Sequence, residues 1–146
     1  MISETLYSSK SAEWETPQDF FDALDSEFHF TLDAASSDEN AKCKHHFTKE
    51  NDGLRKSWAG ETVWLNPPYG KNIRNWMEKA YKESLRGATV VCLVPARTDA
   101  KWFHDWVYQK PNVEIRFVKG RLKFGGSQYN APFPSMIVVY KAEEGE

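Results

Sequence analysis

A continuous apolar run at residues 89–94 is the feature that most constrains the fold. It holds Val90, Val91, Cys92, Leu93 and Val94 without a polar interruption, which is typical of a strand buried on both faces. A strand of this kind needs helices on both sides of its sheet. Just before it, apolar residues from Ile73 to Leu85 recur at helical spacing and predict an amphipathic helix that ends at Gly87.

The other segments extend this alternation of helices and strands. Thr16 and Pro17 predict a helix start, with Thr16 as the cap, and Phe20 to Phe28 continue it at near-helical spacing. We expect strands at 28–33, 62–65, 113–118 and 135–140, and a further helix around 102–107. Strand–helix alternation predicts an α/β sheet whose ligands bind beyond the carboxyl ends of the strands, here after Asp33, Leu65 and Val94.

Length and composition bound the organisation of the chain. Its 146 residues predict a single domain over 1–146, with loose tails at about 1–12 and 141–146. The net charge of −2 excludes a globally basic nucleic-acid binder, so any contact with DNA would need a local patch. Cys43 and Cys92 have no metal or redox spacing and suit free thiols in a reducing cytoplasm. No apolar run is long enough for a membrane span.

The loop Asn66-Pro67-Pro68-Tyr69 directly follows the predicted strand 62–65 and carries the chemistry. The two prolines fix the backbone and remove two donors, so the loop presents carbonyls in a rigid frame. Asn66 adds a side-chain acceptor and Tyr69 adds a flat ring. An adenine amino group is a poor nucleophile because its lone pair is delocalised, and two acceptors on its N–H bonds would free that lone pair. The loop therefore predicts catalysis by orientation and fixed dipoles.

Seven pieces of the chain, in order, resemble the phage-type DNA N6-adenine methyltransferase (Dam-like) family from about Trp14 to Val139. They are Trp14-Glu15-Thr16-Pro17, Phe30 to Ser36, Asp52-Gly53-Leu54 with Trp58, Trp64 to Gly70, Leu93 to Asp99 with Trp102-Phe103-His104, Gly120 to Phe124, and Ala131 to Ser135. The resemblance implies S-adenosylmethionine as cofactor, adenine in DNA as substrate, and Asn66, Pro67, Pro68 and Tyr69 as the catalytic loop. It also implies a phage or prophage protein of the bacterial host cytoplasm that protects DNA from restriction.

The resemblance further implies a cofactor site. Its expected residues are Trp14, Thr16, Pro17, Asp33, Ala34 and Asp52. Asp52 is expected to accept a hydrogen bond from the adenine of the cofactor. All of these except Ala34 also have a plainer interpretation: Thr16-Pro17 as a helix start, Asp33 and Asp52 as turn residues, and Trp14 as core.

The expected fold is a compact, trimmed Rossmann-like methyltransferase sheet, mostly parallel with an antiparallel C-terminal strand and helices on both faces. Two departures set it apart from larger methyltransferases. Asp33 is followed by Ala34, Ala35, Ser36 and Ser37 in place of a glycine-rich turn, and only 32 residues separate Asp33 from Asn66. That stretch is too short for two further strand–helix units, so we expect a shallow cofactor pocket.

Basic residues gather after the Asn66 loop and predict a phosphate-contacting rim. The candidates are Lys71, Arg74, Arg97, Lys101, Arg121 and Lys123. The alternative for each is solvated surface charge. His45 and His46 lie beside Cys43, but the spacing does not support a metal site and none is expected.

Two other functions fit the same residues. An Asn-Pro-Pro-Tyr loop also suits methylation of a glutamine side-chain amide, because an amide nitrogen poses the same electronic problem. A non-catalytic nucleic-acid-binding module of the same fold is the other alternative, favoured by the missing glycine-rich turn. The basic rim favours DNA, and binding of the cofactor would separate an enzyme from a binding module.

Overall fold

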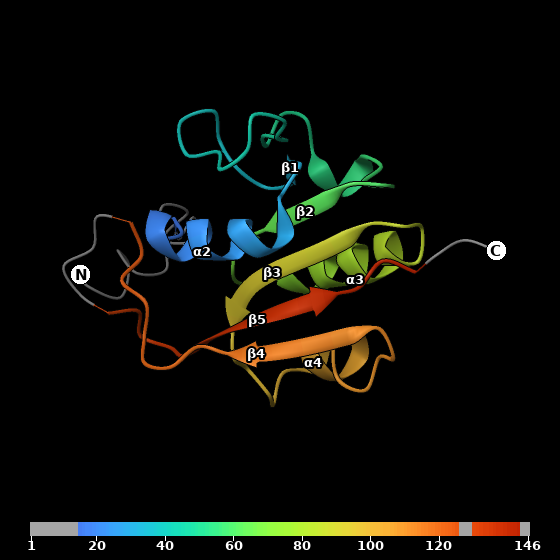
Figure 1. Cartoon of the computed structure of the whole chain (residues 1–146). Helices are drawn as coiled ribbons and strands as arrows, with labels where there is room; N and C mark the ends of the chain where they lie inside the picture. The colour runs from blue at the N-terminus through green and yellow to red at the C-terminus, as the bar shows by residue number, and fades with distance from the viewer. Residues whose placement is uncertain (1–14, 126–129, 144–146) are drawn as a thin grey trace.

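In the part of the chain that the structure describes, five strands form one mixed sheet in the order β1-β2-β3-β5-β4 (Figure 1). The strands are β1 (Leu32–Asp33), β2 (Thr62–Leu65), β3 (Thr89–Pro95), β4 (Val113–Phe117) and β5 (Ser135–Tyr140). β1, β2 and β3 pair in parallel, whereas β5 lies between β3 and β4 and runs antiparallel to both. β4 therefore points the same way as β1 to β3. The predicted antiparallel C-terminal strand is confirmed, and the sheet as a whole is mixed, with two parallel and two antiparallel pairings.

The structure is a computed structural model that describes residues 15–125 and 130–143. Its helices are α2 (Gln18–Phe28), α3 (Ile73–Ser84) and α4 (Lys101–Trp106), with a short 3-10 helix η1 (Gly53–Arg55). α3 and α4 lie against one face of the sheet and α2 lies across the other (Figure 1). The expectation of an α/β fold with helices on both faces is confirmed.

Alternation along β3 explains why its sequence is apolar throughout. Val90, Cys92 and Val94 belong to the core cluster that includes α3 and α4, whereas Val91 and Leu93 belong to the cluster on the α2 side. All five side chains are fully buried. Both faces of the central strand are therefore covered, as a continuous apolar run requires.

The predicted strand at 28–33 is wrong over most of its length. α2 continues to Phe28, and His29 then ends the helix in the left-handed conformation, with φ 58°. Phe30 stacks on Phe21 of α2 with ring centroids 5.4 Å apart. Aromatic packing against the helix occupies this segment, so β1 is reduced to Leu32–Asp33.

No strand forms in the connection between β1 and β2, which is described throughout. The segment that follows β1 loops round instead and returns to the edge of β1, where Asp33 and His46 form an isolated parallel bridge. Asp33 N–H donates to His45 O (3.1 Å), and Phe47 N–H donates to Asp33 O (2.9 Å). Residues 34–47 thus form a loop beside β1.

The chain ends need one correction. The predicted tail at 1–12 and the last residues, 144–146, lie outside the described residues, as does Trp14. Lys141 and Glu143, expected to start a loose tail, are instead tied to the fold: their N–H groups donate to Asn112 O (2.8 Å) and Ser84 O (2.9 Å). Within 15–125 and 130–143, no helix has the length and apolar character needed to cross a membrane.

Candidate active site

The loop Asn66-Pro67-Pro68-Tyr69 borders a cavity of about 750 Å³ at the carboxyl end of β2. This volume is within the ordinary range for small-molecule sites. The predicted site residues that line it are Thr16, Asp33, Ala34, Asp52, Asn66, Pro68, Tyr69 and Lys71. Pro67 is buried and Pro17 half-buried, and neither lines the cavity. The fold therefore gathers most of the predicted adenine and cofactor residues in one place.

Asn66 is held by a residue 50 positions earlier in the chain. Its side-chain Nδ2 donates to Thr16 Oγ1 at 3.2 Å, and Thr16 is only 3% exposed. This bond orients the amide by its nitrogen, and Oδ1 is the acceptor of the same group. It also corrects the prediction that Thr16 caps α2: the cap position is Pro17, with no side-chain cap bond, because the Thr16 hydroxyl is engaged by Asn66.

Tyr69 is fixed at both its hydroxyl and its ring. The hydroxyl donates to Leu93 O of β3 at 3.1 Å, and burial raises the pKa of Tyr69 far above its ordinary value. The ring meets Phe133 and Phe124 edge-on, with centroids 5.6 and 6.4 Å apart. A ring packed at its edges in this way keeps its orientation, which suits a surface for a planar ligand.

Asp33 is a buried carboxylate at the end of β1, with 2% of its surface exposed. Its two oxygens accept the N–H groups of Lys42 (2.9 Å) and Ala35 (3.3 Å). Burial raises the pKa of Asp33 to about 6, although these two bonds act in the opposite direction. Asp33 is thus ionised at neutral pH and able to accept further hydrogen bonds.

Gly53 lies in close contact with the backbone of Ala34, the residue that follows Asp33. A Cβ atom at Gly53 would collide with the backbone oxygen of Ala34 and come within 3.3 Å of the Trp76 ring. Asp52 beside it lines the cavity with φ 58°, and its carboxylate lies 3.5 Å from Arg55. The tight Asp52-Gly53 turn against Ala34 therefore shapes the cavity floor.

A buried network that the sequence analysis missed supports this floor. Trp58 donates from Nε1 to Gly53 O (3.0 Å) and stacks on Trp76 with centroids 6.4 Å apart. Glu83, 1% exposed, accepts the Trp58 N–H and contacts two cations, Arg86 at 2.7 Å and Lys79 at 3.2 Å.

Burial alone would raise the pKa of Glu83. The bonds from Trp58, Arg86 and Lys79 outweigh burial, and the pKa lies below its ordinary value. The available signal was a carboxylate three residues after Ala80 on the apolar stripe of α3. A charged residue at such a position needs buried partners.

The predicted basic rim divides into two groups. Arg74 and Lys101 share one carboxylate, Asp105 of α4, at 3.6 and 2.8 Å, so much of their charge is offset within the protein. Arg97, Arg121 and Lys123 are exposed, and no ion pair involves them among the described residues. Lys71 lines the cavity.

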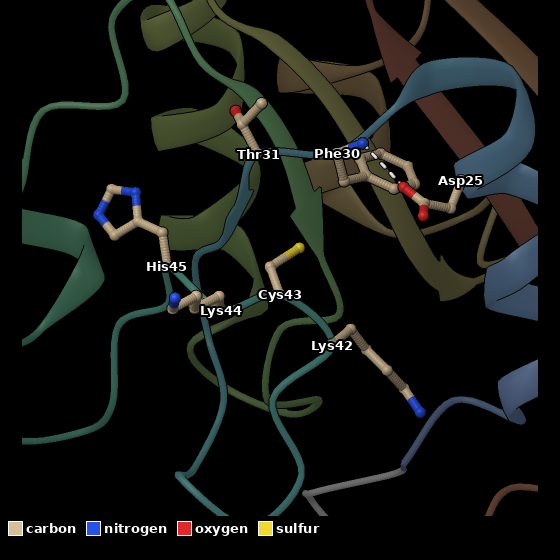
Figure 2. Close-up of a pocket in the computed structure, with 7 residues that line it drawn as sticks. All are labelled: Asp25, Phe30, Thr31, Lys42, Cys43, Lys44 and His45. Carbon is tan, nitrogen blue, oxygen red and sulfur yellow. Dashed lines mark hydrogen bonds between the residues drawn. The ribbon is translucent and has the colours of Figure 1, made fainter.

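A second, more open cavity of about 610 Å³ lies beside β1 (Figure 2). Figure 2 shows Cys43 near its centre, with Lys42 turned to one side and His45 to the other. Lys42 donates to Gln18 of α2 (2.8 Å), and burial raises the pKa of Cys43 to about 12, so the thiol stays protonated. None of the Asn66 loop lines this cavity. Cys43 and Cys92 are both free, as predicted.

The described residues contain no cluster of three or more histidine, cysteine or acidic side chains that could hold a metal ion.

Comparison with known proteins identifies the family. The family model for DNA N-6-adenine-methyltransferase (Dam) matches residues 3–144, nearly the whole chain. The chain belongs to this family of DNA N-6-adenine methyltransferases, and the resemblance inferred from the sequence is confirmed.

Two curated relatives agree with this assignment. The "DNA N-6-adenine-methyltransferase" of Escherichia phage T1 is 32% identical over 94 residues, which cover 63% of this chain and 39% of the phage protein. "Putative methyltransferase YfdM" of Escherichia coli (strain K12) is 33% identical over 64 residues, 39% of this chain and 70% of that protein. The match thus spans about two fifths of the length of the phage T1 relative.

Proposed function

We propose that this chain transfers a methyl group from S-adenosylmethionine to the N6 amino group of adenine in DNA. One observation carries the proposal: a single cavity is lined both by Asn66, Pro68 and Tyr69 of the loop and by Asp33 with the Asp52-Gly53 turn. A methyl transfer needs its donor and acceptor side by side in one space. Membership of the Dam family supports the same reaction.

The residues present fit the cofactor. The cavity of about 750 Å³ is in the volume range of sites that bind small molecules such as the cofactor. Gly53 and Ala34 both line it, and the close contact between their backbones leaves no room for a Cβ atom at Gly53. Asp33 and Asp52 would hold the cofactor through their carboxylates, which suit its positive charge and its N–H and O–H groups. When bound, S-adenosylmethionine supplies a methyl group activated by a positively charged sulfur.

The Asn66 loop would hold the adenine. Asn66 Oδ1 accepts from one N–H bond of the amino group, and the Pro67 carbonyl accepts from the other once it turns toward the cavity, which Pro67 does not line in this structure. These two bonds draw the nitrogen toward a tetrahedral shape and free the lone pair. Tyr69 keeps the base in plane by stacking. These groups act as preorganised dipoles, because hydrogen bonds to Thr16 and Leu93 already fix the side chains of Asn66 and Tyr69.

To enter this cavity, the adenine must either be flipped out of a duplex or be supplied by a single strand. Exposed Arg97, Arg121 and Lys123, with Lys71 at the cavity wall, would contact phosphates of the nucleic acid. The sheet order and the strandless connection between β1 and β2 support a trimmed Rossmann-like methyltransferase fold over a single domain.

The direct test is to identify the methylated nucleoside. DNA is incubated with the protein and cofactor labelled on its methyl group, then digested to nucleosides. N6-methyldeoxyadenosine should carry the label with the wild type and should fall by about 10²–10³-fold with Asn66→Ala. Label on glutamine of an added protein would move the assignment to amide methylation. Absence of cofactor binding by calorimetry would indicate a non-catalytic module.

A further inference from the structure

Phe117, the last residue of β4, is the most exposed of the large hydrophobic side chains that the structure describes. Its exposed fraction is 68%, against 49% for Tyr108 and 42% for Leu85. The ring of Tyr108 stacks on Phe103 with centroids 5.9 Å apart. No ring contact involves Phe117 within residues 15–125 and 130–143. An aromatic ring this open to water and this poorly packed is not explained by the core.

The position of Phe117 relates it to the main cavity. β4 runs in the same direction as β2, so Phe117 lies at the sheet edge where Asn66 follows β2. The order β2-β3-β5-β4 separates the two strands by three spacings. At about 4.8 Å each, these place Phe117 roughly 14 Å from the cavity wall along the sheet.

Positive charge follows Phe117 directly. Residues 118–125 contain Lys119, Arg121 and Lys123 and no acidic residue. All three cations are exposed, and none has an ion pair among the described residues. Arg74 and Lys101, by contrast, share Asp105. This part of the edge therefore keeps an uncompensated positive charge beside an open aromatic ring.

We propose that Phe117 with Lys119, Arg121 and Lys123 forms a docking surface for a nucleic-acid strand, on which a base outside the adenine cavity stacks. An aromatic ring among cations is the chemistry that binds unstacked bases and their phosphates. A span of roughly 14 Å corresponds to about four steps of 3.4 Å along one strand. The strand that delivers adenine to Asn66 reaches Phe117 within a few nucleotides. The inference rests on the proposed function, which makes nucleic acid the substrate.

The test compares three variants on a short labelled single strand that contains adenine. Phe117→Ala should weaken binding, measured by fluorescence anisotropy, by roughly 5- to 150-fold, the equivalent of about 1–3 kcal/mol. Phe117→Trp should retain the affinity because it keeps a stacking surface. Tyr108→Ala is the matched control: it also removes an exposed aromatic ring, but away from the cations, and should leave binding unchanged.

Salt dependence separates stacking from charge. Phe117→Ala should lower affinity at every salt concentration with the same slope, whereas Arg121→Ala should reduce the slope by about one unit. Melting temperatures check that each variant is folded, and calorimetry with S-adenosylmethionine should give the wild-type affinity for Phe117→Ala.

Three results would overturn the proposal. The first is unchanged strand affinity in Phe117→Ala, and the second is an equal loss in Tyr108→Ala. The third is a wild-type dimer that Phe117→Ala converts to monomer with no loss of strand binding, because the open edge of β4 would then be a surface between two copies. Failure of the proposed function is separate: a wild type that binds the strand through Phe117 but never methylates DNA would keep this surface and refute the reaction.

Discussion

The hydrogen bond between Thr16 and Asn66 allows a sharp test of how the catalytic amide is positioned. Thr16 Oγ1 accepts from Asn66 Nδ2 at 3.2 Å in a site where Thr16 is almost wholly buried. Thr16→Val replaces the hydroxyl by a methyl group of similar size, so it removes the bond with little change in packing. Thr16→Ser is the matched control, because it keeps the hydroxyl and loses only a methyl group.

The magnitude follows from the kind of bond. A neutral hydrogen bond contributes about 0.5–1.5 kcal/mol net. If Thr16 acts by holding the Asn66 amide in its reacting orientation, Thr16→Val should slow methyl transfer by roughly 2- to 13-fold. Asn66→Ala, which removes the acceptor itself, should slow it by about 10²–10³-fold. The double variant should be no slower than Asn66→Ala alone, because Thr16 then has nothing left to orient.

The assay is single-turnover methyl transfer at saturating DNA and cofactor, with cofactor affinity measured separately by calorimetry. We expect Thr16→Val to change the rate and leave the cofactor affinity near the wild-type value. The reverse pattern, a lower affinity for the cofactor with an unchanged rate of methyl transfer, would refute the positioning role and make Thr16 a cofactor contact. Additive losses in the double variant would also refute it.

Three further outcomes are expected. Because burial raises the pKa of Asp33 to about 6, its carboxylate becomes protonated as pH falls through that value. Cofactor affinity should therefore decline below about pH 6 and stay flat above it, and an affinity independent of pH from 5 to 7 would argue against a cofactor contact at Asp33. Glu83→Gln should lower the free energy of unfolding by about 1.5–3 kcal/mol in denaturant titrations, since it removes a buried charge-assisted acceptor, and an unchanged midpoint would contradict this. Arg97→Ala should reduce the slope of DNA affinity against salt concentration by about one unit. Arg74→Ala should reduce it less, because Arg74 is already paired with Asp105 in the wild type. Equal effects of the two substitutions would show that this ion pair does not affect DNA binding.

Local patterns predicted most of the fold. The run at 89–94 and the helical spacing from Ile73 depend on neighbours a few residues away, and both elements form where expected. The strand expected at 28–33 failed because Phe28 and Phe30 are aromatic, and aromatic rings suit a strand as well as they suit packing against a helix. Only the tertiary contact with Phe21 decides between them.

The site divides in the same way. The Asn66 loop was predictable, because both its residue types and its position after a strand can be recognised from neighbouring residues in the sequence. The bond from Thr16 to Asn66 crosses 50 residues, and that from Glu83 to Trp58 crosses 25. Neither pairing follows from spacing along the chain. Composition gave the basic residues but not their partners, so the pairing of Arg74 and Lys101 with Asp105 needed the structure.

The place of β5 affects the order in which the protein can be built. Among the strands that the structure describes, β4 pairs with β5 alone, and β5 is also the neighbour of β3. During synthesis β4 emerges before the strand that joins it to the rest, so it stays an unpaired edge until Ser135–Tyr140 arrives. A strand that is made after both of its neighbours favours a folding reaction in which the sheet is completed in one step once β5 is available, with the basic edge that follows β4 assembled last.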